Sequence, residues 1–387
     1  MEPLLPETQR GILAQKTMEA THLAGMLDGK IPSEKTREVL TTLLEKLNSY
    51  YSNLIEGSKT KLQDIDAAFV QDFSNDPKKK NLQLLAVAHI KIEREVKKWL
   101  SEGQSPYSVE FIQEIHRRFY EGLAEDQRIY EGTSGKLYQL IPGKLRDHIV
   151  VVGHHKSIPP EDLSKYLDRF FQFYKSDKII STNRLISISA AHQRLVWIHP
   201  FPDGNGRASR LFTQACLIYH GYNASSVWSL SRAFAREKDK YYHSLHQADQ
   251  PRRSDTDGRG FLSDAGLSEF CLFTLDQMID QIGFMTKILD FDSVEKNYRR
   301  FAEDTPLLSD HAEAYGCIGS LLFRKGIIER SEVAQELACS HATATERIKR
   351  VLASGIASTP SEKGNLHLNF PENVVNKILP RLYDTTI

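Results

Sequence analysis

Apolar residues recur at steps of three and four positions along most of the chain, the spacing that gathers side chains on one face of an α-helix. The first long example is a leucine-rich stripe formed by Leu40, Leu43, Leu44, Leu47, Tyr51 and Leu54. Gly57 follows this stripe, and glycine is the residue that most often ends a helix. The pattern predicts a long amphipathic helix that ends near Gly57.

Similar spacing predicts further helices along the chain. We expect them at about residues 82–100, 108–123, 160–174 and 185–198, with another from about residue 207 to Gly221. Residues 149–152 are the exception, because β-branched side chains bounded by glycine and proline favour a strand. The expected fold is therefore mainly α, with one short β-hairpin.

The C-terminal part has a different pattern. A short helix at 330–337, a turn at 338–340 and a second helix at 341–354 precede an alternating segment at 365–369. A helix, a tight turn, a second helix and a hairpin are the order of a winged helix-turn-helix domain. We therefore expect such a domain at this end of the chain.

Composition narrows the class of protein. The chain has 387 residues, too many for one ordinary core, and 50 Lys+Arg balance 50 Asp+Glu. Net charge therefore provides no chain-wide attraction to nucleic acid or to a membrane. The four cysteines form no C-x-x-C pair, which argues against a zinc ribbon and a dense disulfide framework. No signal-like core and no apolar run of ~20 residues occur, so we expect a cytoplasmic protein without a membrane span.

The chemistry-bearing residues concentrate in one loop, which begins at His199 and reads His-Pro-Phe-Pro-Asp-Gly-Asn-Gly-Arg. Pro200 and Pro202 lack the amide donor that a helix needs, so the preceding helix has to end here. His199 and Asp203 are consequently not a metal-binding pair on one helix face. An ordinary helix–loop–helix turn with a satisfied histidine is the alternative to a functional loop.

The second half of this loop suits a phosphate group. Residues 204–206 can each adopt positive φ and turn successive backbone N–H groups inward as an anion nest, at the start of the next helix. Arg207 and Arg210 are three positions apart and can fork onto the same phosphates. Asp203 is a hard oxygen ligand for Mg²⁺, and His199 can accept a proton near neutral pH. The pattern indicates a Mg²⁺–nucleotide site beside a general base.

Residues 199–210 resemble the full signature of the Fic family, His-Pro-Phe-x-Asp-Gly-Asn-Gly-Arg-x-x-Arg. The resemblance implies that His199 deprotonates a target hydroxyl and that Asp203 holds Mg²⁺. The residues that it assigns to ATP are Gly204, Asn205, Gly206, Arg207, Ala208, Ser209 and Arg210. The two glycines match the version of the loop that transfers AMP, whereas the related Doc-type kinases carry alanine and lysine there.

Two further segments resemble parts of a Fic nucleotide site. Val152, Gly153, His154 and His155 are similar to the flap that aligns the target segment by strand addition and leans over the nucleotide. Tyr241, with its neighbour Tyr242, is similar to the aromatic pair beside the adenine pocket. Without the resemblance, the histidines would be solvated loop residues and the tyrosines core residues.

The end of the first long helix resembles the Ser/Thr-x-x-x-Glu-Gly/Asn inhibitory motif of Fic proteins, with Ser52 and Glu56 in the defining positions. The resemblance implies that Glu56 pairs with Arg210 and blocks the γ-phosphate position. An exposed glutamate at a helix end is the ordinary alternative. In some relatives the same glutamate supports removal of AMP, and the sequence leaves that activity open.

Together these features predict a self-inhibited protein adenylyltransferase that moves AMP from ATP, with Mg²⁺, to a Ser, Thr or Tyr hydroxyl of a protein target or of itself. The expected domains are an N-terminal helical region carrying the inhibitory helix (1–105), a helical Fic catalytic core (106–295) and the winged helix-turn-helix (296–387). One alternative is a nucleotide-sensing, DNA-binding regulator, although the helix at 341–354 combines Arg347, Lys349 and Arg350 with Glu346 and would suit a protein partner at least as well. Transfer of a different phosphoryl-linked group is another alternative, and a homodimer stays open.

Overall fold

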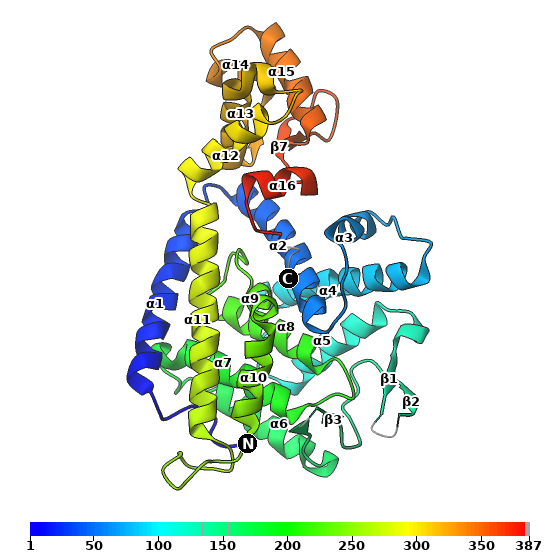
Figure 1. Cartoon of the computed structure of the whole chain (residues 1–387), viewed down its shortest axis with the longest axis vertical. Coiled ribbons are helices and arrows are strands. Elements are labelled where there is room, and N and C mark those ends of the chain that lie inside the picture. Colours follow the sequence, from blue (N-terminus) through cyan, green and yellow to red (C-terminus); the bar gives the residue numbers. More distant parts are fainter. Residues whose placement is uncertain (133–134, 154, 384–387) are drawn as a thin grey trace. The chain divides into compact units, whose positions relative to one another are not determined.

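The computed structural model describes residues 1–132, 135–153 and 155–383, and these are mainly helical (Figure 1). Contacts between Cα atoms group the chain into two compact units. The first contains residues 1–24, 48–224 and 229–281, and the second contains 25–47, 225–228 and 282–387. The division into three domains stays a prediction.

The first unit holds most of the helices. Three of them, α1 (Arg10–Gly29), α2 (Glu34–Ile55) and α11 (Asp264–Ile288), have residues in both units. The others are α3 (Leu62–Phe69), α4 (Pro77–Ser101), α5 (Val109–Glu121), α6 (Leu163–Tyr174), α7 (Ser181–Ile198), α8 (Asn205–Tyr219), α9 (Leu230–Arg236) and α10 (Lys238–Asp249). Short 3₁₀ turns occur at Glu125–Gln127 and Pro160–Asp162.

The predicted ends of the helices have clear physical causes. Helix α2 ends at Ile55, and Gly57 adopts φ 82°, while its N–H donates to the carbonyl of Leu54 at 3.0 Å. Helix α5 begins after Ser108, whose Oγ accepts a hydrogen bond from the N–H of Phe111 at 3.1 Å. The periodic pattern therefore located these helices correctly.

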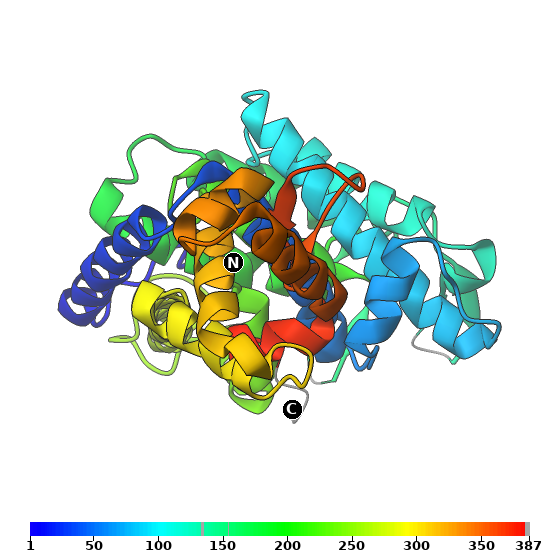
Figure 2. The ribbon, with the colours of Figure 1, turned by 90° about the horizontal axis from the view of Figure 1, so that it is seen from above.

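The core of the first unit forms around α7 and α8, which pack against each other (Figure 1). Figure 2 shows from above that helices make up most of the chain. Helix α6 covers α7, while α4 and α5 pack on α8. The buried side chains that fill these contacts include Phe111, Ile112, Ile115, Phe170, Leu195, Ile198, Leu211 and Phe212. The loop between α7 and α8 is consequently anchored at both ends in the core.

The described residues of the first unit form two small antiparallel hairpins, where the sequence analysis expected one. Strands β3 (Val151–Val152) and β4 (His155–Lys156) form the expected hairpin, although only two residues of the segment 149–152 are in the strand. Strands β1 (Ile129–Glu131) and β2 (Leu137–Gln139) form the second. The expectation of a single hairpin was wrong because β1 and β2 are short and largely exposed, so they lack an apolar pattern.

The second unit contains the predicted C-terminal helices and a small sheet. Its elements are α12 (Phe291–Glu303), a 3₁₀ turn (Ser309–His311), α13 (Ala312–Lys325), β5 (Ile327–Ile328), α14 (Arg330–Glu336), α15 (His341–Ser354), β6 (Ala357–Ser358), β7 (Leu366–Leu368) and α16 (Glu372–Ile378). The strands form an antiparallel sheet in the order β5-β7-β6. The assignment of a winged helix-turn-helix to these elements stays a prediction.

In the described part of the chain, no helix combines the length and the apolar character needed to cross a lipid bilayer.

Candidate active site

The loop with the predicted signature begins where α7 ends. His199 caps α7 in the left-handed conformation, with φ 56° and ψ 63°, and its N–H still donates to the carbonyl of Leu195 at 3.1 Å. Pro200 cannot extend the helix, so the chain turns away here. Gly204 then adopts φ 78° and caps α8. The imidazole of His199 and the N-terminus of α8 therefore stand at the two ends of one short loop.

Asn205 and Phe201 hold this loop in shape. The Asn205 Oδ1 accepts from the backbone N–H of Phe201 at 2.9 Å, and its Nδ2 donates to the carbonyl of the same residue at 2.8 Å. The Phe201 ring is fully buried and stacks on His116, with 4.0 Å between ring centroids. Both polar atoms of the Asn205 side chain are therefore used in hydrogen bonds within the loop. In the role predicted for it, Asn205 can bind a nucleotide only through its backbone N–H.

Arg146 is a positioning residue that the sequence analysis missed. Its Nε donates to the carbonyl of His199 at 2.6 Å, and its Nη2 donates to that of Ile198 at 3.3 Å. Its Nη1 donates to the carbonyl of His148, just before the β3–β4 hairpin, at 2.9 Å. Burial lowers the pKa of Arg146 to about 10. A lone arginine distant in sequence from residues 198–199 offers no local pattern from which this role could be predicted.

The imidazole of His199 is oriented as a proton acceptor. Its Nδ1 lies 3.3 Å from the carbonyl of Val196, which can only accept, so Nδ1 carries the hydrogen and Nε2 keeps its lone pair. Burial lowers the pKa of His199 to about 4, and a positive charge on His155 acts in the same direction. The side chain is therefore neutral near pH 7 and can accept a proton.

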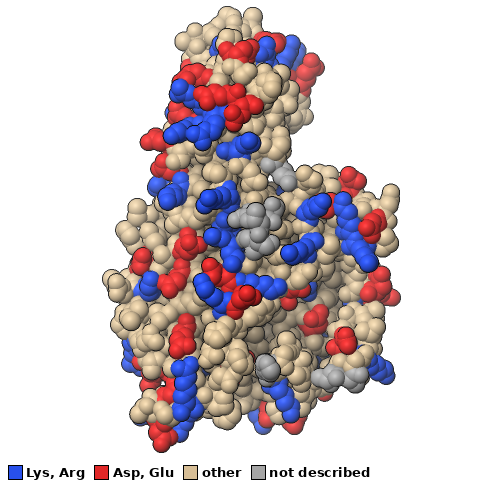
Figure 3. Space-filling model, viewed as in Figure 1, with Lys and Arg blue, Asp and Glu red and all other residues tan. Residues whose placement is uncertain are grey.

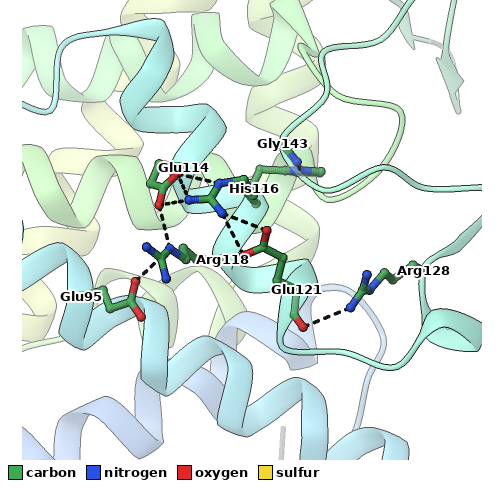
Figure 4. A network of polar contacts seen from close by, with 8 residues as sticks. Glu95, Glu114, His116, Arg118, Glu121, Arg128 and Gly143 are labelled. Atoms are coloured by element: carbon green, nitrogen blue, oxygen red, sulfur yellow. Dashed lines mark hydrogen bonds and ion pairs between the residues drawn. The ribbon is translucent and has the colours of Figure 1, made fainter.

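Asp203 is exposed at the rim of the loop, and α5 holds it in place. The Tyr120 hydroxyl donates to Asp203 Oδ2 at 2.9 Å. His116 Nδ1 accepts from the N–H of Gly143 at 2.9 Å, so its Nε2 donates to the carbonyl of Asp203 at 3.1 Å. Figure 4 shows His116 turned toward Gly143. The same figure shows an ion pair between the two neighbouring helices, in which Arg118 of α5 lies 3.6 Å from Glu95 of α4.

Asp203 fits a magnesium ion whose other ligands come from elsewhere. No group of three or more His, Cys, Asp or Glu side chains within the described residues could enclose a metal. A single exposed carboxylate is typical of Mg²⁺ that keeps waters and substrate phosphates as its other ligands. The site therefore suits a metal that arrives with a nucleotide.

The predicted phosphate nest differs from what the sequence suggested. Of residues 204–206, only Gly204 has positive φ, because Asn205 and Gly206 already lie in the first turn of α8. The first bond of this helix runs from the N–H of Ala208 to the carbonyl of Gly204, at 3.0 Å. The backbone N–H groups that precede Ala208 in α8 have no acceptor within the helix and point out of its start. A helix N-terminus of this kind binds anions, but it is not a nest of residues with positive φ. The expectation of positive φ at each of these residues was wrong, since the helix begins two residues earlier than predicted.

The two arginines of the signature have different surroundings. Arg207 is partly exposed, stacks over the Phe119 ring at 5.3 Å and donates to the Tyr120 hydroxyl at 3.4 Å. Arg210 is buried, as are the side chains of Ala208 and Ser209. The assignment of Ala208 and Ser209 to the nucleotide stays a prediction. Because both side chains are buried, these residues would contact the nucleotide through their backbone.

Arg210 is engaged with the end of α2. Its Nε donates to Ser52 Oγ at 3.0 Å, and its Nη2 donates both to the carbonyl of Ser52 at 3.0 Å and to Glu56 Oε1 at 2.6 Å. Burial raises the pKa of Glu56, but the charges of Arg210 and Arg207 outweigh burial and hold that pKa below its usual range. A Cβ at Gly206 would run into Glu56 Oε1. The structure therefore brings Ser52, Glu56 and Arg210 together as a charged cluster at the start of α8.

The flap and the tyrosine pair are only partly as expected. Val152 is 54% exposed, His155 lies beside His199, and His154 lies outside the described residues. Tyr241 is buried, and its hydroxyl lies 2.8 Å from His192 Nε2. Tyr242 is the exposed member of the pair, and its hydroxyl donates to the carbonyl of Ile55 at 3.1 Å. The roles of Val152, Gly153 and Tyr241 in nucleotide binding stay predictions.

Comparisons with known proteins agree with this geometry. Residues 106–217, which contain α5 and the signature loop, match the family model described as Fic/DOC family. Protein adenylyltransferase Fic of Drosophila virilis is 35% identical over 128 residues, 33% of this chain and 25% of that protein. The protein of the same name from Nematostella vectensis is 28% identical over 200 residues, 51% of this chain and 42% of that protein. The chain thus spans about a quarter to two fifths of the length of these relatives.

Solved structures show the same fold. A Fic family protein from Desulfovibrio desulfuricans superposes with a TM-score of 0.55 at 15% identity, over 96% of this chain and 99% of that one. A Fic domain containing signaling protein from Bacteroides thetaiotaomicron gives 0.53 at 19% identity, over 70% and 96%. The fold and the loop define a Fic-type helical domain. Within the chain, residues 106–217 are the part that matches the Fic/DOC family.

Proposed function

We propose that this protein transfers AMP from ATP to a Ser, Thr or Tyr hydroxyl of a protein, with its own chain among the candidate targets. The observation that carries the proposal is the pairing of an oriented base with an anion site on one loop. His199 has its Nδ1 hydrogen bonded to Val196, and the N-terminus of α8 begins six residues later at Asn205. The curated relatives carry the name protein adenylyltransferase, which supports the same activity.

The chemistry follows from this arrangement. The hydroxyl oxygen of the target forms a bond to the α-phosphorus, the bond from that phosphorus to the bridging oxygen breaks, and pyrophosphate leaves. His199 Nε2 takes the hydroxyl proton. The N–H groups at the start of α8 and the guanidinium of Arg207 hold the phosphates as charge moves toward the leaving group. Asp203 would hold Mg²⁺, which supplies further positive charge to the phosphates.

We further propose that Glu56 restrains this activity. Its carboxylate, 2.6 Å from Arg210 Nη2, places a negative charge beside the start of α8, where the phosphates would bind. A bound γ-phosphate would have to approach that carboxylate and compete with it for the same guanidinium. ATP can then bind, but its α-phosphorus is poorly aligned with the hydroxyl. Freeing Arg210 should restore the alignment.

Charge pairing in the second unit gives little support to the alternative of a DNA-binding regulator. Three of its basic side chains are paired with carboxylates: Arg324 with Glu336 at 3.1 Å, Lys325 with Glu332 at 2.7 Å and Arg350 with Asp310 at 2.7 Å. Figure 3 shows acidic and basic side chains interspersed over the visible face of this unit. DNA binding depends on basic groups that are available to phosphates. We therefore favour a protein partner for this unit.

Mass spectrometry tests the proposed activity directly. The Glu56→Gly protein is incubated with Mg²⁺ and each common nucleoside triphosphate in turn, alone and with a mixture of cell proteins. We expect a gain of one AMP mass with ATP, and no gain in the Glu56→Gly/His199→Ala protein. A gain of a different phosphoryl-linked group would favour the alternative in which the protein transfers that group instead of AMP. No gain with any nucleotide would contradict the proposed activity.

A further inference from the structure

A buried tyrosine lies between the proposed metal ligand and one of the arginines of the signature. Tyr120, on the last turn of α5, is 3% exposed. Its hydroxyl donates to Asp203 Oδ2 at 2.9 Å, and Arg207 Nη1 donates to the same hydroxyl at 3.4 Å. A phenol has one hydrogen to donate and lone pairs that accept, so this oxygen can serve both neighbours at once. The contact joins two charged groups of the site through a neutral one.

The Tyr120 ring is fixed in place and its hydroxyl keeps its hydrogen. The ring centroid lies 4.7 Å from that of His116, which is also on α5. A Cβ at Gly204 would run into the Tyr120 hydroxyl, so the backbone of the loop packs directly on the phenol. Burial, together with the negative charge of Asp203, raises the pKa of Tyr120 well above its ordinary value of 10. The hydroxyl is therefore a hydrogen-bond donor to Asp203 at neutral pH.

The two charged groups that Tyr120 joins are not paired with each other. Arg207 forms no ion pair within the part of the chain that the structure describes, although Asp203 lies only four positions before it. The Nε of Arg207 is buried and also lacks a hydrogen-bond partner there. Asp203 Oδ1 likewise has no partner among the described residues, and its side chain is exposed. A direct ion pair would occupy the carboxylate that suits Mg²⁺ and the guanidinium that suits a phosphate.

We propose that Tyr120 is a positioning residue that keeps Asp203 and Arg207 from pairing, so that the carboxylate stays available to Mg²⁺ and the guanidinium to the phosphates. The inference rests on the proposed function, in which Asp203 binds a metal that arrives with the nucleotide. The hydrogen bond from Tyr120 occupies Oδ2 and leaves Oδ1 for the metal. Without the hydroxyl, Arg207 loses its acceptor and the nearby carboxylate takes its place, so that Mg²⁺ has to compete with a guanidinium.

The test measures how much Mg²⁺ improves nucleotide binding. The probe is α,β-methylene-ATP, in which the bond that AMP transfer would break is replaced. Its Kd is measured by calorimetry with Mg²⁺ and with EDTA. The reference is the Glu56→Gly protein, in which Arg210 is free for the γ-phosphate. When Tyr120→Phe is added to it, we expect the gain in affinity that Mg²⁺ provides to fall by about tenfold or more, as is typical when a metal ligand loses the partner that orients it.

Two further variants of the reference protein calibrate this measurement. Asp203→Ala sets the lower limit of the gain, and adding Tyr120→Phe to it should change the gain no further, because both changes act on one contact. Tyr107→Phe is the matched control, since Tyr107 is also buried and its hydroxyl lies 2.9 Å from Nε2 of His220, at the opposite end of α8 from the loop. We expect this control to keep the full gain. Urea unfolding checks that each variant is folded.

The rate of AMP transfer separates positioning from support of the fold. With Tyr120→Phe, the Mg²⁺ concentration that gives half the maximal rate should rise by about tenfold. The rate at saturating Mg²⁺ should stay within about threefold of the reference, because excess metal displaces the guanidinium from the carboxylate. A merely structural role would lower the rate by the same factor at every Mg²⁺ concentration, and that result would overturn the inference.

The binding measurement decides the inference independently of the rate. An unchanged Mg²⁺ gain in the Tyr120→Phe protein would contradict it. A reference protein that binds the analogue equally well with Mg²⁺ and with EDTA would contradict it too, because Asp203 would then hold no metal. If the Glu56→Gly protein transfers no AMP at all, the proposed function fails, and the Mg²⁺ gain still shows whether Tyr120 keeps Asp203 available.

Discussion

Arg210 Nη2 lies 2.6 Å from Glu56 Oε1, although 154 positions separate these residues in the chain. The same guanidinium donates to the hydroxyl and to the carbonyl of Ser52, so it is bound to α2 at two acceptors and to Glu56, which follows α2, at a third. Only 3% of the Arg210 side chain is exposed, whereas 29% of the Glu56 side chain is. The glutamate is therefore the member of the pair that can move away without leaving a cavity in the core.

His199→Ala should abolish AMP transfer and leave ATP binding within about tenfold of the parent, or roughly 1.4 kcal/mol. The reason is that His199 acts on the hydroxyl, while the start of α8 and the arginines hold the phosphates. Transfer is measured as AMP incorporation and binding by calorimetry, with His148→Gln as a control outside the loop. Undiminished transfer by the alanine variant would remove the proposed base.

Arg146→Lys should slow transfer by at least about tenfold, because a lysine cannot replace the planar fork that bridges several carbonyls. The free energy of unfolding should fall by about 1–3 kcal/mol, since buried carbonyl groups lose their donor. Rates and urea unfolding curves measure the two effects. Lys144→Gln is the matched control, as Lys144 is exposed and pairs only with Asp147 in the described structure. A normal rate in Arg146→Lys would show that the loop keeps its shape without this arginine.

Tyr242→Phe should weaken the restraint that we propose for α2. The Tyr242 hydroxyl donates to the carbonyl of Ile55, directly before Glu56, and one such bond contributes about 0.5–1.5 kcal/mol. We expect transfer to rise severalfold in the parent and not at all in the Glu56→Gly protein, where no restraint is left. Tyr219→Phe, another exposed tyrosine, is the control. An equal effect in both backgrounds would mean that Tyr242 acts on the nucleotide rather than on α2.

Stability should fall as the pH falls from about 6.5 toward 4. Burial lowers the pKa of His116 to about 4 from its ordinary value of 6.5. Between these values the unfolded chain binds a proton that the folded chain does not, so the free energy of unfolding decreases, by roughly 3 kcal/mol at most for this residue. Urea unfolding at pH 7.5 and 4.5 measures the change. In His116→Gln the free energy of unfolding should differ less between the two pH values than it does in the parent. An equal difference in both proteins would mean that other groups cause the loss of stability.

The sequence predicted those parts of the fold and site that depend on local spacing. The end of α2 at Gly57 and the break at Pro200 follow from the conformations that glycine and proline allow. The signature loop was predicted because its residues are contiguous, and Ser52 and Glu56 were recognised because they are four positions apart. The contact of Glu56 with Arg210 was predicted by the family resemblance and is present in the structure.

The remaining features depend on contacts between distant segments. Arg146 reaches carbonyls 52 and 53 positions away, and His116 reaches the carbonyl of Asp203 across 87 positions. No spacing rule relates such pairs. The β1–β2 hairpin was missed for another reason, since Tyr130 and Tyr138 stack across it at 5.6 Å while most of its residues stay exposed. An exposed hairpin has no alternating apolar face from which it can be predicted.

The rate of radiolabelled AMP incorporation by Glu56→Gly tests the restraint on Arg210 most directly. Freeing Arg210 for the γ-phosphate should raise this rate by at least ~10-fold, roughly 1.4 kcal/mol of barrier. The rate for Glu56→Asp should lie between those of the parent and of Glu56→Gly. The double variant Glu56→Gly/Arg210→Ala should have the same rate as Arg210→Ala alone, since both changes act on one contact.

The chain offers a close control for this measurement in Glu102→Gly. Glu102 also follows a long helix and precedes a glycine with positive φ, Gly103, but its side chain is 59% exposed and lies 3.8 Å from Lys98. We predict that Glu56→Gly incorporates AMP at least ~10-fold faster than the parent while Glu102→Gly does not. A Glu56→Gly protein no faster than the parent would make the end of α2 an ordinary helix terminus and would contradict self-inhibition.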